Sequence, residues 1–367
     1  MTFNHSQKAF LELVKAGLWE KEALLSQFGD IDFAEVCRLA EEQSVLGLVL
    51  AGLEHSDIRP PQDLLLQWIG EVQMLEQQNK AMNAFVAKLI DDLRSKNIYA
   101  ILVKGQGIAQ CYEKPLWRAS GDVDLLLSDD DYEKAKEVLL PNAIDVEPEF
   151  KSLKHLGMTL KGGFLVELHG MLHSRLSKRI DRTIDKVQHD VFYGGKVRAW
   201  HHGDAMVCLP SPDNDVIFVF THILKHFYIE GIGLRQICDW CRLLWTYRDS
   251  LNHGLLESRI LKMGLMSEWK AFTAFAVEYL GMPVEVMPFY NGRWQKKAKR
   301  IMAFVLETGN LGHNREIKRS KHFFLGKIQA AWFKMGDFIR HARVFPMDSV
   351  KFFWHYLCDG IQQAYVI

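Results

Sequence analysis

The sequence has little cysteine, no excess of either charge and no long apolar run. Six cysteines are spread over 367 residues, which excludes the dense disulfide framework of small secreted proteins. Lys and Arg total 45, as do Asp and Glu, so the whole chain has no net attraction for nucleic acid. No stretch approaches the roughly 18 apolar residues of a membrane span, and the first residues lack the pattern of a signal peptide. We therefore expect a soluble, cytoplasmic protein.

Charge is nevertheless segregated along the chain. Residues 293–343 contain 13 Lys and Arg residues against three acids, so the remainder of the chain is acidic. One interpretation is a solvated helical surface that offsets this acidic remainder. The other is a docking face for a polyanion such as RNA, a phosphorylated metabolite or an acidic protein.

Hydrophobic periodicity divides the chain into three parts. Apolar residues three and four positions apart predict helices over residues 1–97, including one long helix over 63–96. Short β-rich runs alternate with helical segments over 98–210, and helical patterning resumes over 211–367. We expect an α+β fold with a small mixed sheet, a helical N-terminal region packed on it and an all-helical C-terminal half.

Two carboxylates stand on one predicted strand, in the segment Gly-Asp-Val-Asp-Leu-Leu that begins at Gly121. Side chains alternate between the faces of a strand, so Asp122 and Asp124 point the same way while Val123 enters the core. Neighbouring carboxylates repel each other unless a cation lies between them, and a hard divalent cation such as Mg²⁺ meets that need. The alternative is a solvated pair at a strand edge.

Three nearby features favour a phosphate-handling site. Lys104, Gly105, Gln106 and Gly107 form a turn between a predicted strand and a helix, where backbone N–H groups can approach a phosphate. Arg118 precedes the aspartates and can bind phosphate oxygens in a bidentate manner.

A further predicted strand carries the third feature. Residues 157–160 and 164–169 flank Lys-Gly-Gly and predict a hairpin. Glu167 and His169 share one face of its second strand, so Glu167 can complete a cluster of three carboxylates.

Together these segments resemble the DNA polymerase β-like nucleotidyltransferase superfamily. More narrowly, Leu-Val-Lys-Gly, Arg-Ala-Ser-Gly-Asp-Val-Asp-Leu-Leu-Leu and Val-Glu-Leu-His-Gly are similar to the uncharacterised bacterial nucleotidyltransferase family, over about residues 85 to 250. The resemblance implies transfer of a nucleotide from a nucleoside triphosphate to an unidentified acceptor. It implies Mg²⁺ or Mn²⁺ on Asp122, Asp124 and Glu167, with Glu167 either completing a second metal position or acting as the base.

The same resemblance implies roles for residues outside the carboxylate cluster. Phosphates are expected on Lys104, on the backbone of residues 105–107 and on Arg118. The expected acceptor pocket consists of His169, Lys225, His226, Arg235 and Asp239.

The family's usual Gly-Gly or Gly-Ser turn is replaced here by Gly105-Gln106. This departure favours an alternative function, a nucleotide-binding or partner-binding module without turnover. An RNA-processing transferase is a third possibility, argued from the basic region.

Two smaller motifs have simpler interpretations. His222 and His226 share a helix face and could bind zinc, but no third ligand is obvious in the sequence, so we expect them to line the cleft. Cys238 and Cys241 lie within helical patterning and are interpreted as buried thiols.

Overall fold

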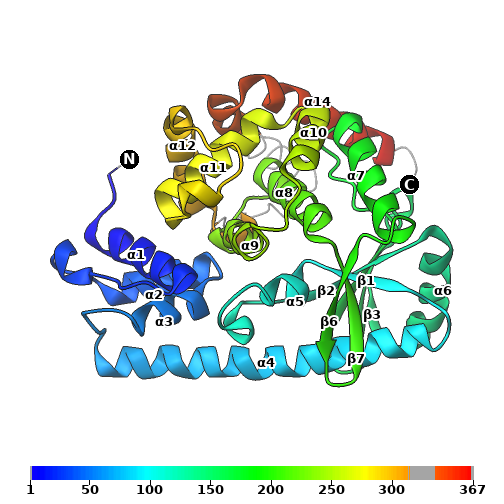
Figure 1. Cartoon of the computed structure of the whole chain (residues 1–367), viewed down its shortest axis with the longest axis horizontal. Helices are drawn as coiled ribbons and strands as arrows, with labels where there is room; N and C mark the ends of the chain where they lie inside the picture. Colours follow the sequence, from blue (N-terminus) through cyan, green and yellow to red (C-terminus); the bar gives the residue numbers. More distant parts are fainter. Residues whose placement is uncertain (1, 313, 315–334, 365–367) are drawn as a thin grey trace, which may run out of the picture.

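The computed structural model describes residues 2–312, 314 and 335–364 of the chain. It has the predicted α+β architecture, with one small mixed sheet, a two-stranded hairpin and many helices (Figure 1). Within the described residues, no helix combines the length and apolarity needed to cross a membrane.

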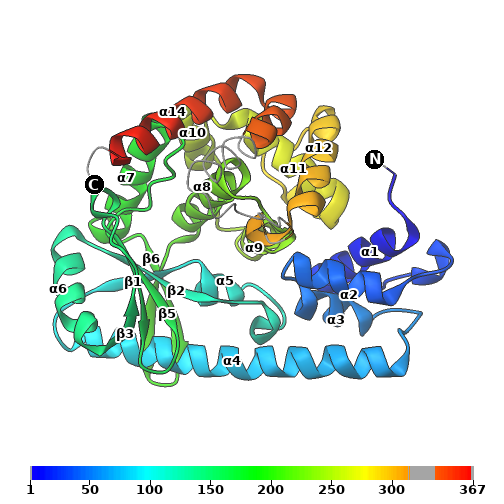
Figure 2. The same cartoon turned by 180° about the vertical axis from the view of Figure 1, so that it is seen from behind.

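The N-terminal part is helical, as its periodicity predicts. Three helices precede the double proline: α1 His5–Trp19, α2 Phe33–Glu42 and α3 Leu46–Leu53. The long helix α4, Gln62–Arg94, starts directly after Pro61. It runs beneath both the N-terminal helices and the sheet, so it connects the two (Figures 1 and 2).

The sheet has five strands in the order β1-β2-β5-β4-β3. The strands are β1 Ala100–Val103, β2 Asp122–Leu127, β3 Ala143–Val146, β4 His155–Leu160 and β5 Leu165–His169. Only β2 and β5 pair in parallel, and the predicted hairpin is the antiparallel pair β4 and β5. The parallel pair places the aspartate strand directly beside the glutamate strand.

Short helices and a hairpin flank this sheet. Helix α5, Gly105–Ala109, follows β1. Ser128 caps helix α6, Asp129–Leu139, by accepting a hydrogen bond from the Asp131 backbone N–H. Strands β6 Val197–His202 and β7 Ala205–Pro210 form the hairpin.

The remaining helices form the second half of the molecule. They are α7 Lys178–Phe192, α8 Pro212–Ile229, α9 Leu234–Thr246, α10 His253–Met263, α11 Met266–Leu280, α12 Gln295–Thr308 and α14 Pro346–Ala364. Their apolar faces share one core with the N-terminal helices. Trp19 of α1, for example, donates its indole N–H to the Leu280 carbonyl at 2.6 Å. A second core lies between α4, the sheet and α6.

Candidate active site

Three carboxylates converge on one face of the sheet, where β2 and β5 run side by side. Asp124 and Glu167 are direct partners in the parallel register, and Asp122 lies two residues before Asp124 on the same face. One oxygen of each carboxylate lies within 4.8 Å of the others. The alternation of a strand therefore brings together the three acids singled out in the sequence.

Asp122 and Asp124 differ in how their charge is compensated. Asp124 is buried, and its Oδ1 accepts from Lys104 Nζ and contacts His169 Nε2, each at 2.7 Å. Burial alone would raise the pKa of Asp124, but Lys104 and His169 outweigh it and hold the pKa below its usual value. Asp122 has no hydrogen-bond or ion-pair partner among the described residues, and repulsion from Asp124, followed by burial, raises its pKa. This uncompensated carboxylate is what a bound cation would relieve.

Glu167 is held by two imidazoles. Its Oε2 lies 3.1 Å from His155 Nε2 and 3.4 Å from His169 Nε2. Burial would raise the pKa of Glu167, but these two contacts overcome it and hold the pKa far below the usual range. A carboxylate with so low a pKa is a poor proton acceptor and a good ligand for a cation.

The turn after β1 has an unusual backbone. Lys104 adopts φ 58° and ψ −141°, and Gly105 follows with φ 36°. A side chain is rarely tolerated at such angles. The Lys104 ammonium reaches Asp124 from this position, so the strained residue places a cation on the carboxylate cluster.

The other two residues of the turn face away from the cleft. Gln106 is 1% exposed, and its amide donates to Asn79 Oδ1 at 2.9 Å and to Met82 Sδ at 3.0 Å on α4. A Cβ on Gly107 would lie 2.7 Å from a methyl carbon of Leu209, so this glycine allows β7 to pack closely. Of the turn expected to contact phosphate, Lys104 and Gly105 line the cleft.

Most of the hydrogen-bond donors of the Arg118 side chain are used by other groups of the protein. Its Nε and Nη2 donate to the two oxygens of Asp239 at 2.9 and 2.6 Å, and its Nη1 donates to Ser120 Oγ and to the Ala119 carbonyl. Tyr112 also donates to Asp239 at 2.8 Å. Burial would lower the pKa of Arg118, but Asp239 raises it well above the usual value. Arg118 and Asp239, expected in separate subsites, form one buried ion pair.

Helix α8 supplies the opposite wall of the cleft. Lys225 lines the cleft without a hydrogen bond or ion pair among the described residues, and so does Arg175 from the loop after β5. Burial, and then the nearby Lys104, lowers the pKa of Lys225. Two cations without an ion-pair partner among the described residues thus line the same cleft as the carboxylate cluster, and this cleft of about 1810 Å³ is open to solvent.

His222 and His226 lie on the same wall and contact each other. Their Nε2 atoms are 2.9 Å apart, and His226 Nδ1 lies 2.7 Å from Glu230 Oε2. Burial and the surrounding cations, Lys104 first, hold the pKa of His222 well below its usual value. Neither histidine belongs to a group of three metal-ligating side chains in the described part of the chain.

The cleft gathers most of the residues predicted from the sequence. Those that line it are Lys104, Gly105, Arg118, Asp122, Asp124, Glu167, His169, Lys225, His226, Arg235 and Asp239. Sequence reasoning did not include His155 and Arg175 among the site residues. His155 carried a usable signal, because extending the predicted hairpin by two residues places it opposite His169. Arg175 has a positive φ and lies in a loop, where no periodic pattern predicts which way a side chain points.

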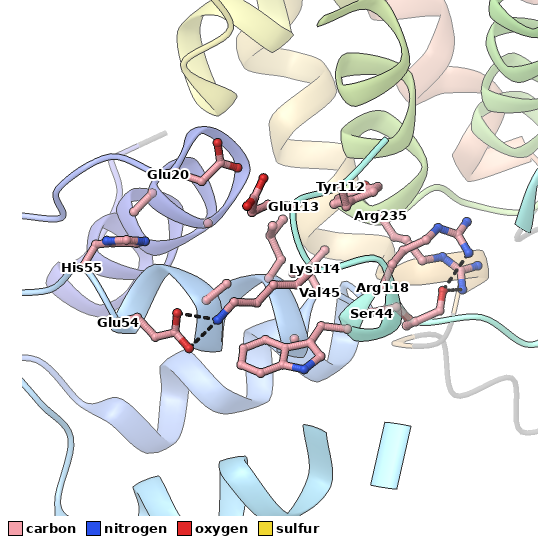
Figure 3. A pocket seen from close by; sticks show the side chains of 17 residues that line it. Glu20, Ser44, Val45, Glu54, His55, Tyr112, Glu113, Lys114, Arg118 and Arg235 are labelled. Atoms are coloured by element: carbon pink, nitrogen blue, oxygen red, sulfur yellow. Dashed lines mark hydrogen bonds and ion pairs between the residues drawn. The ribbon is translucent and has the colours of Figure 1, made fainter. Parts of the chain in front are cut away.

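A second pocket of about 590 Å³ adjoins the cleft, and Arg118 and Arg235 line both spaces. Figure 3 shows the two arginines at one end and Glu20, Glu54 and Glu113 toward the other. Lys114 bonds Glu54 and lies 3.9 Å from the centre of the Trp117 ring. The pocket therefore has a cationic end beside the cleft and an acidic end away from it.

Cys238 and Cys241 are buried on α9, as predicted. Burial raises the pKa of both thiols, so neither is poised for nucleophilic or metal chemistry.

Comparison with known proteins identifies the family. Residues 29–281 match the model of a family described as uncharacterised nucleotidyltransferase, which is more than half of the chain. The chain belongs to this family. Its membership assigns nucleotidyl transfer in general terms and a nucleotide as substrate, and the family typically uses a divalent metal.

Two further comparisons add little to that assignment. No curated protein matches the chain. Among solved structures, an antigenic nucleotidyltransferase-like protein from Paracoccidioides brasiliensis is 16% identical and has a TM-score of 0.32, covering 50% of this chain and 87% of its own.

Proposed function

We propose that the chain transfers a nucleoside monophosphate from a nucleoside triphosphate to an acceptor hydroxyl, with the reaction centred on Asp122, Asp124 and Glu167. The observation that carries the proposal is the convergence of these carboxylates within 4.8 Å beside an otherwise uncompensated Asp122. The acceptor oxygen forms a bond to the α-phosphorus, the bond from this phosphorus to the bridging oxygen breaks, and pyrophosphate leaves.

The oxygen-only donor set of Asp122, Asp124 and Glu167 fits a hard divalent cation. These residues would hold Mg²⁺ or Mn²⁺, which when bound neutralises charge on the triphosphate. The low pKa of Glu167 favours this ligand role over that of the base.

Phosphate oxygens are assigned to the cations of the cleft that keep free donors. Lys225 and Arg175 have no protein partner among the described residues, and Lys104 has one ion pair, with Asp124. Arg118 has few donors left for phosphate oxygens, because Asp239, Ser120 and Ala119 already accept hydrogen bonds from its guanidinium. Gly105 allows the backbone to approach the ligand at the turn.

We assign the role of proton acceptor for the attacking hydroxyl to His222. It lines the cleft, and its lowered pKa keeps the imidazole neutral near pH 7. His226 lies between His222 and the Glu230 carboxylate, so a proton taken by His222 can be shared along this chain.

We place the distal part of the acceptor in the second pocket, because Arg118 and Arg235 line both spaces. The side chain of Ala51 also lines that pocket. Ala51→Phe should therefore reduce transfer to the acceptor and leave nucleotide affinity within about twofold.

The direct test separates nucleotide binding from turnover. Each of the four common nucleoside triphosphates is titrated by calorimetry with Mg²⁺ or Mn²⁺ present, and the α-³²P-labelled form is then incubated with a cell extract as acceptor source. We expect metal-dependent binding, pyrophosphate release and a labelled product, all reduced at least about tenfold by Asp122→Asn. Asp129→Asn, an exposed acid at the start of α6, is the matched control and should have no effect.

One argument for the alternative function, a nucleotide-binding module without turnover, is now weaker. It rested on Gln106, whose side chain points into α4 and leaves the cleft clear. Metal-dependent binding of a triphosphate without pyrophosphate release in any extract would favour that module over the enzyme.

A further inference from the structure

A second group of metal-ligating side chains lies beside the carboxylate cluster and shares one member with it. His155 on β4 is the direct register partner of His169 on β5, and Glu167 lies two residues before His169 on the same face. One ligand atom from each of the three lies within 4.8 Å of the others. Both imidazoles and the carboxylate line the cleft, so they are accessible to a solvated ion.

The distances from Glu167 to the two imidazole nitrogens fit the spacing of ligand atoms around one ion. Ligand atoms about 2.1 Å from a metal and 90–109° apart are about 3.0–3.4 Å from each other. Glu167 Oε2 lies 3.1 Å from His155 Nε2 and 3.4 Å from His169 Nε2. The shorter distance fits a hydrogen bond as well as coordination, whereas the longer one exceeds the usual range of an N–H···O hydrogen bond and lies within the range expected for two ligands of one ion.

The chemistry of this group differs from that of the aspartates. Asp122 and Asp124 offer oxygen alone, whereas His155 and His169 add two imidazole nitrogens, which suit transition metals and not Mg²⁺. Two histidines and one carboxylate also leave coordination positions open to other ligands. We propose that His155, Glu167 and His169 form a nitrogen-containing position for a divalent transition metal, with Glu167 between it and the oxygen-only position.

Loading this position requires one rearrangement in the cleft. His169 Nε2 contacts Asp124 Oδ1 at 2.7 Å, and the same nitrogen cannot hold that hydrogen bond and a metal at once. Asp124 keeps its ion pair with Lys104 at 2.7 Å when His169 turns its lone pair to the ion. Lys104 thus supplies the compensation that frees His169.

The test uses Mn²⁺ with the full-length protein and no nucleotide. Electron paramagnetic resonance counts the bound ions, and the electron spin-echo modulation of the same samples detects coupling to imidazole ¹⁴N. We expect a bound Mn²⁺ with ¹⁴N coupling. His155→Gln and His169→Gln should each weaken its binding at least about tenfold and reduce the coupling.

Two controls make the assignment specific. His173 also lines the cleft but pairs with Asp185, so His173→Gln should change neither affinity nor coupling. Asp122→Asn removes a ligand of the oxygen-only position and should leave the ¹⁴N coupling intact. Circular dichroism spectra and thermal midpoints verify that each variant is folded.

The outcomes separate this proposal from the proposed function. The absence of ¹⁴N coupling at saturating Mn²⁺, or coupling that survives both His155→Gln and His169→Gln, overturns the nitrogen-containing position even if the protein transfers nucleotides. Coupling that depends on these two histidines upholds it, even if no triphosphate binds.

Discussion

At the scale of single residues, the cleft combines strain with charge. Lys104 holds a backbone conformation that glycine adopts more readily, and its ammonium compensates Asp124. Such strain persists only where surrounding contacts over-determine it. The two effects can be separated, because one substitution removes the charge alone and another removes the charge and the strain.

Lys104→Ala should lose the ion pair and keep the strain, whereas Lys104→Gly should lose both. We expect the glycine variant to be more stable than the alanine variant by about 1 kcal/mol, the strain relieved less the chain entropy of glycine. Urea unfolding measures the difference. Both variants should bind a triphosphate more weakly by about 1.5–3 kcal/mol. A glycine variant less stable than the alanine variant would show that residue 104 is not strained.

The ion pair of Arg118 with Asp239 gives a second prediction at this scale. Both side chains are less than a tenth exposed, so removing one leaves the other charge buried and unpaired. Arg118→Met or Asp239→Asn should each lower the free energy of unfolding by about 3–5 kcal/mol. The double variant should lose less than the sum of the two, which a double-mutant cycle in urea measures. Additive losses would contradict a direct, buried pairing.

The residue scale also shows what a sequence can predict about this site. The shared face of Asp122 and Asp124, and that of Glu167 and His169, follow from the alternation of a strand. The pairing of Arg118 with Asp239 does not, because 121 residues separate them and only the packing of α9 brings them together. Local periodicity predicts which face of a helix or strand a side chain lies on. It does not predict which other element that face will pack against.

At the scale of elements, the register of the sheet assembles the cluster. The hairpin of β4 and β5 was predictable from Lys-Gly-Gly between two β-rich runs, and its register brings His155 to His169. The parallel pairing of β2 with β5 does not follow from periodicity alone, because it joins strands that are separated by α6, β3 and β4 along the chain.

Helix α3 positions the segment that carries Arg118, and glycine makes this possible. A Cβ on Gly47 would lie 2.1 Å from the Trp117 carbonyl oxygen, a backbone atom that cannot move alone. Gly47→Ala should therefore cost about 1–3 kcal/mol of stability. Gly70→Ala is the matched control: it lies in α4, nothing lies within 4 Å of the added Cβ, and it should stabilise by about 0.5–1 kcal/mol. Thermal and urea unfolding of the two variants should move in opposite directions.

At the scale of the whole molecule, one shared core joins parts distant in sequence, and a buried acid lies within its C-terminal portion. Glu268 on α11 is fully buried, accepts a hydrogen bond from Tyr228 on α8 at 3.2 Å and faces Asp348 on α14. Burial, and then the charge of Asp348, raises the pKa of Glu268 from 4.5 to about 7. Lys297 also approaches this group. Because this buried acid has a raised pKa in the folded protein, we expect the free energy of unfolding to depend on pH.

The sign of that dependence follows from proton linkage. The folded protein binds the proton of Glu268 more tightly than the unfolded chain, so this contribution is fully present below about pH 4.5 and is lost as pH rises toward 7. The loss amounts to about 3 kcal/mol. Glu268→Gln should flatten the stability profile between pH 5 and 8, measured by urea unfolding. An unchanged slope in this variant would assign the pH dependence to other groups.

The excess of basic residues over 293–343 leads to a prediction about the binding of polyanions. Four of these basic residues, Arg315, Lys318, Arg319 and Lys321, lie outside the described residues. A cluster at the start of α12 is described and consists of Arg293, Lys296, Lys297 and Arg300. In it, Lys297 packs on the rings of Trp294 and Phe345, whereas the other three side chains are exposed. The exposed three are therefore the members that could contact a polyanion, while Lys297 also has a packing role.

A polyanion held by this cluster should respond to salt in a defined way. Each phosphate contact on a single strand contributes a slope of about −0.7 to the logarithm of affinity against the logarithm of salt concentration. Neutralising Arg293, Lys296 and Arg300 to Gln should flatten that slope by about two for single-stranded RNA, measured by fluorescence anisotropy from low to moderate salt. Replacing Lys80, Lys88 and Lys134, three exposed lysines on α4 and α6, removes the same charge elsewhere and controls for the overall field. Equal flattening in both triple variants would make the cluster ordinary surface, because binding would then follow net charge and not position.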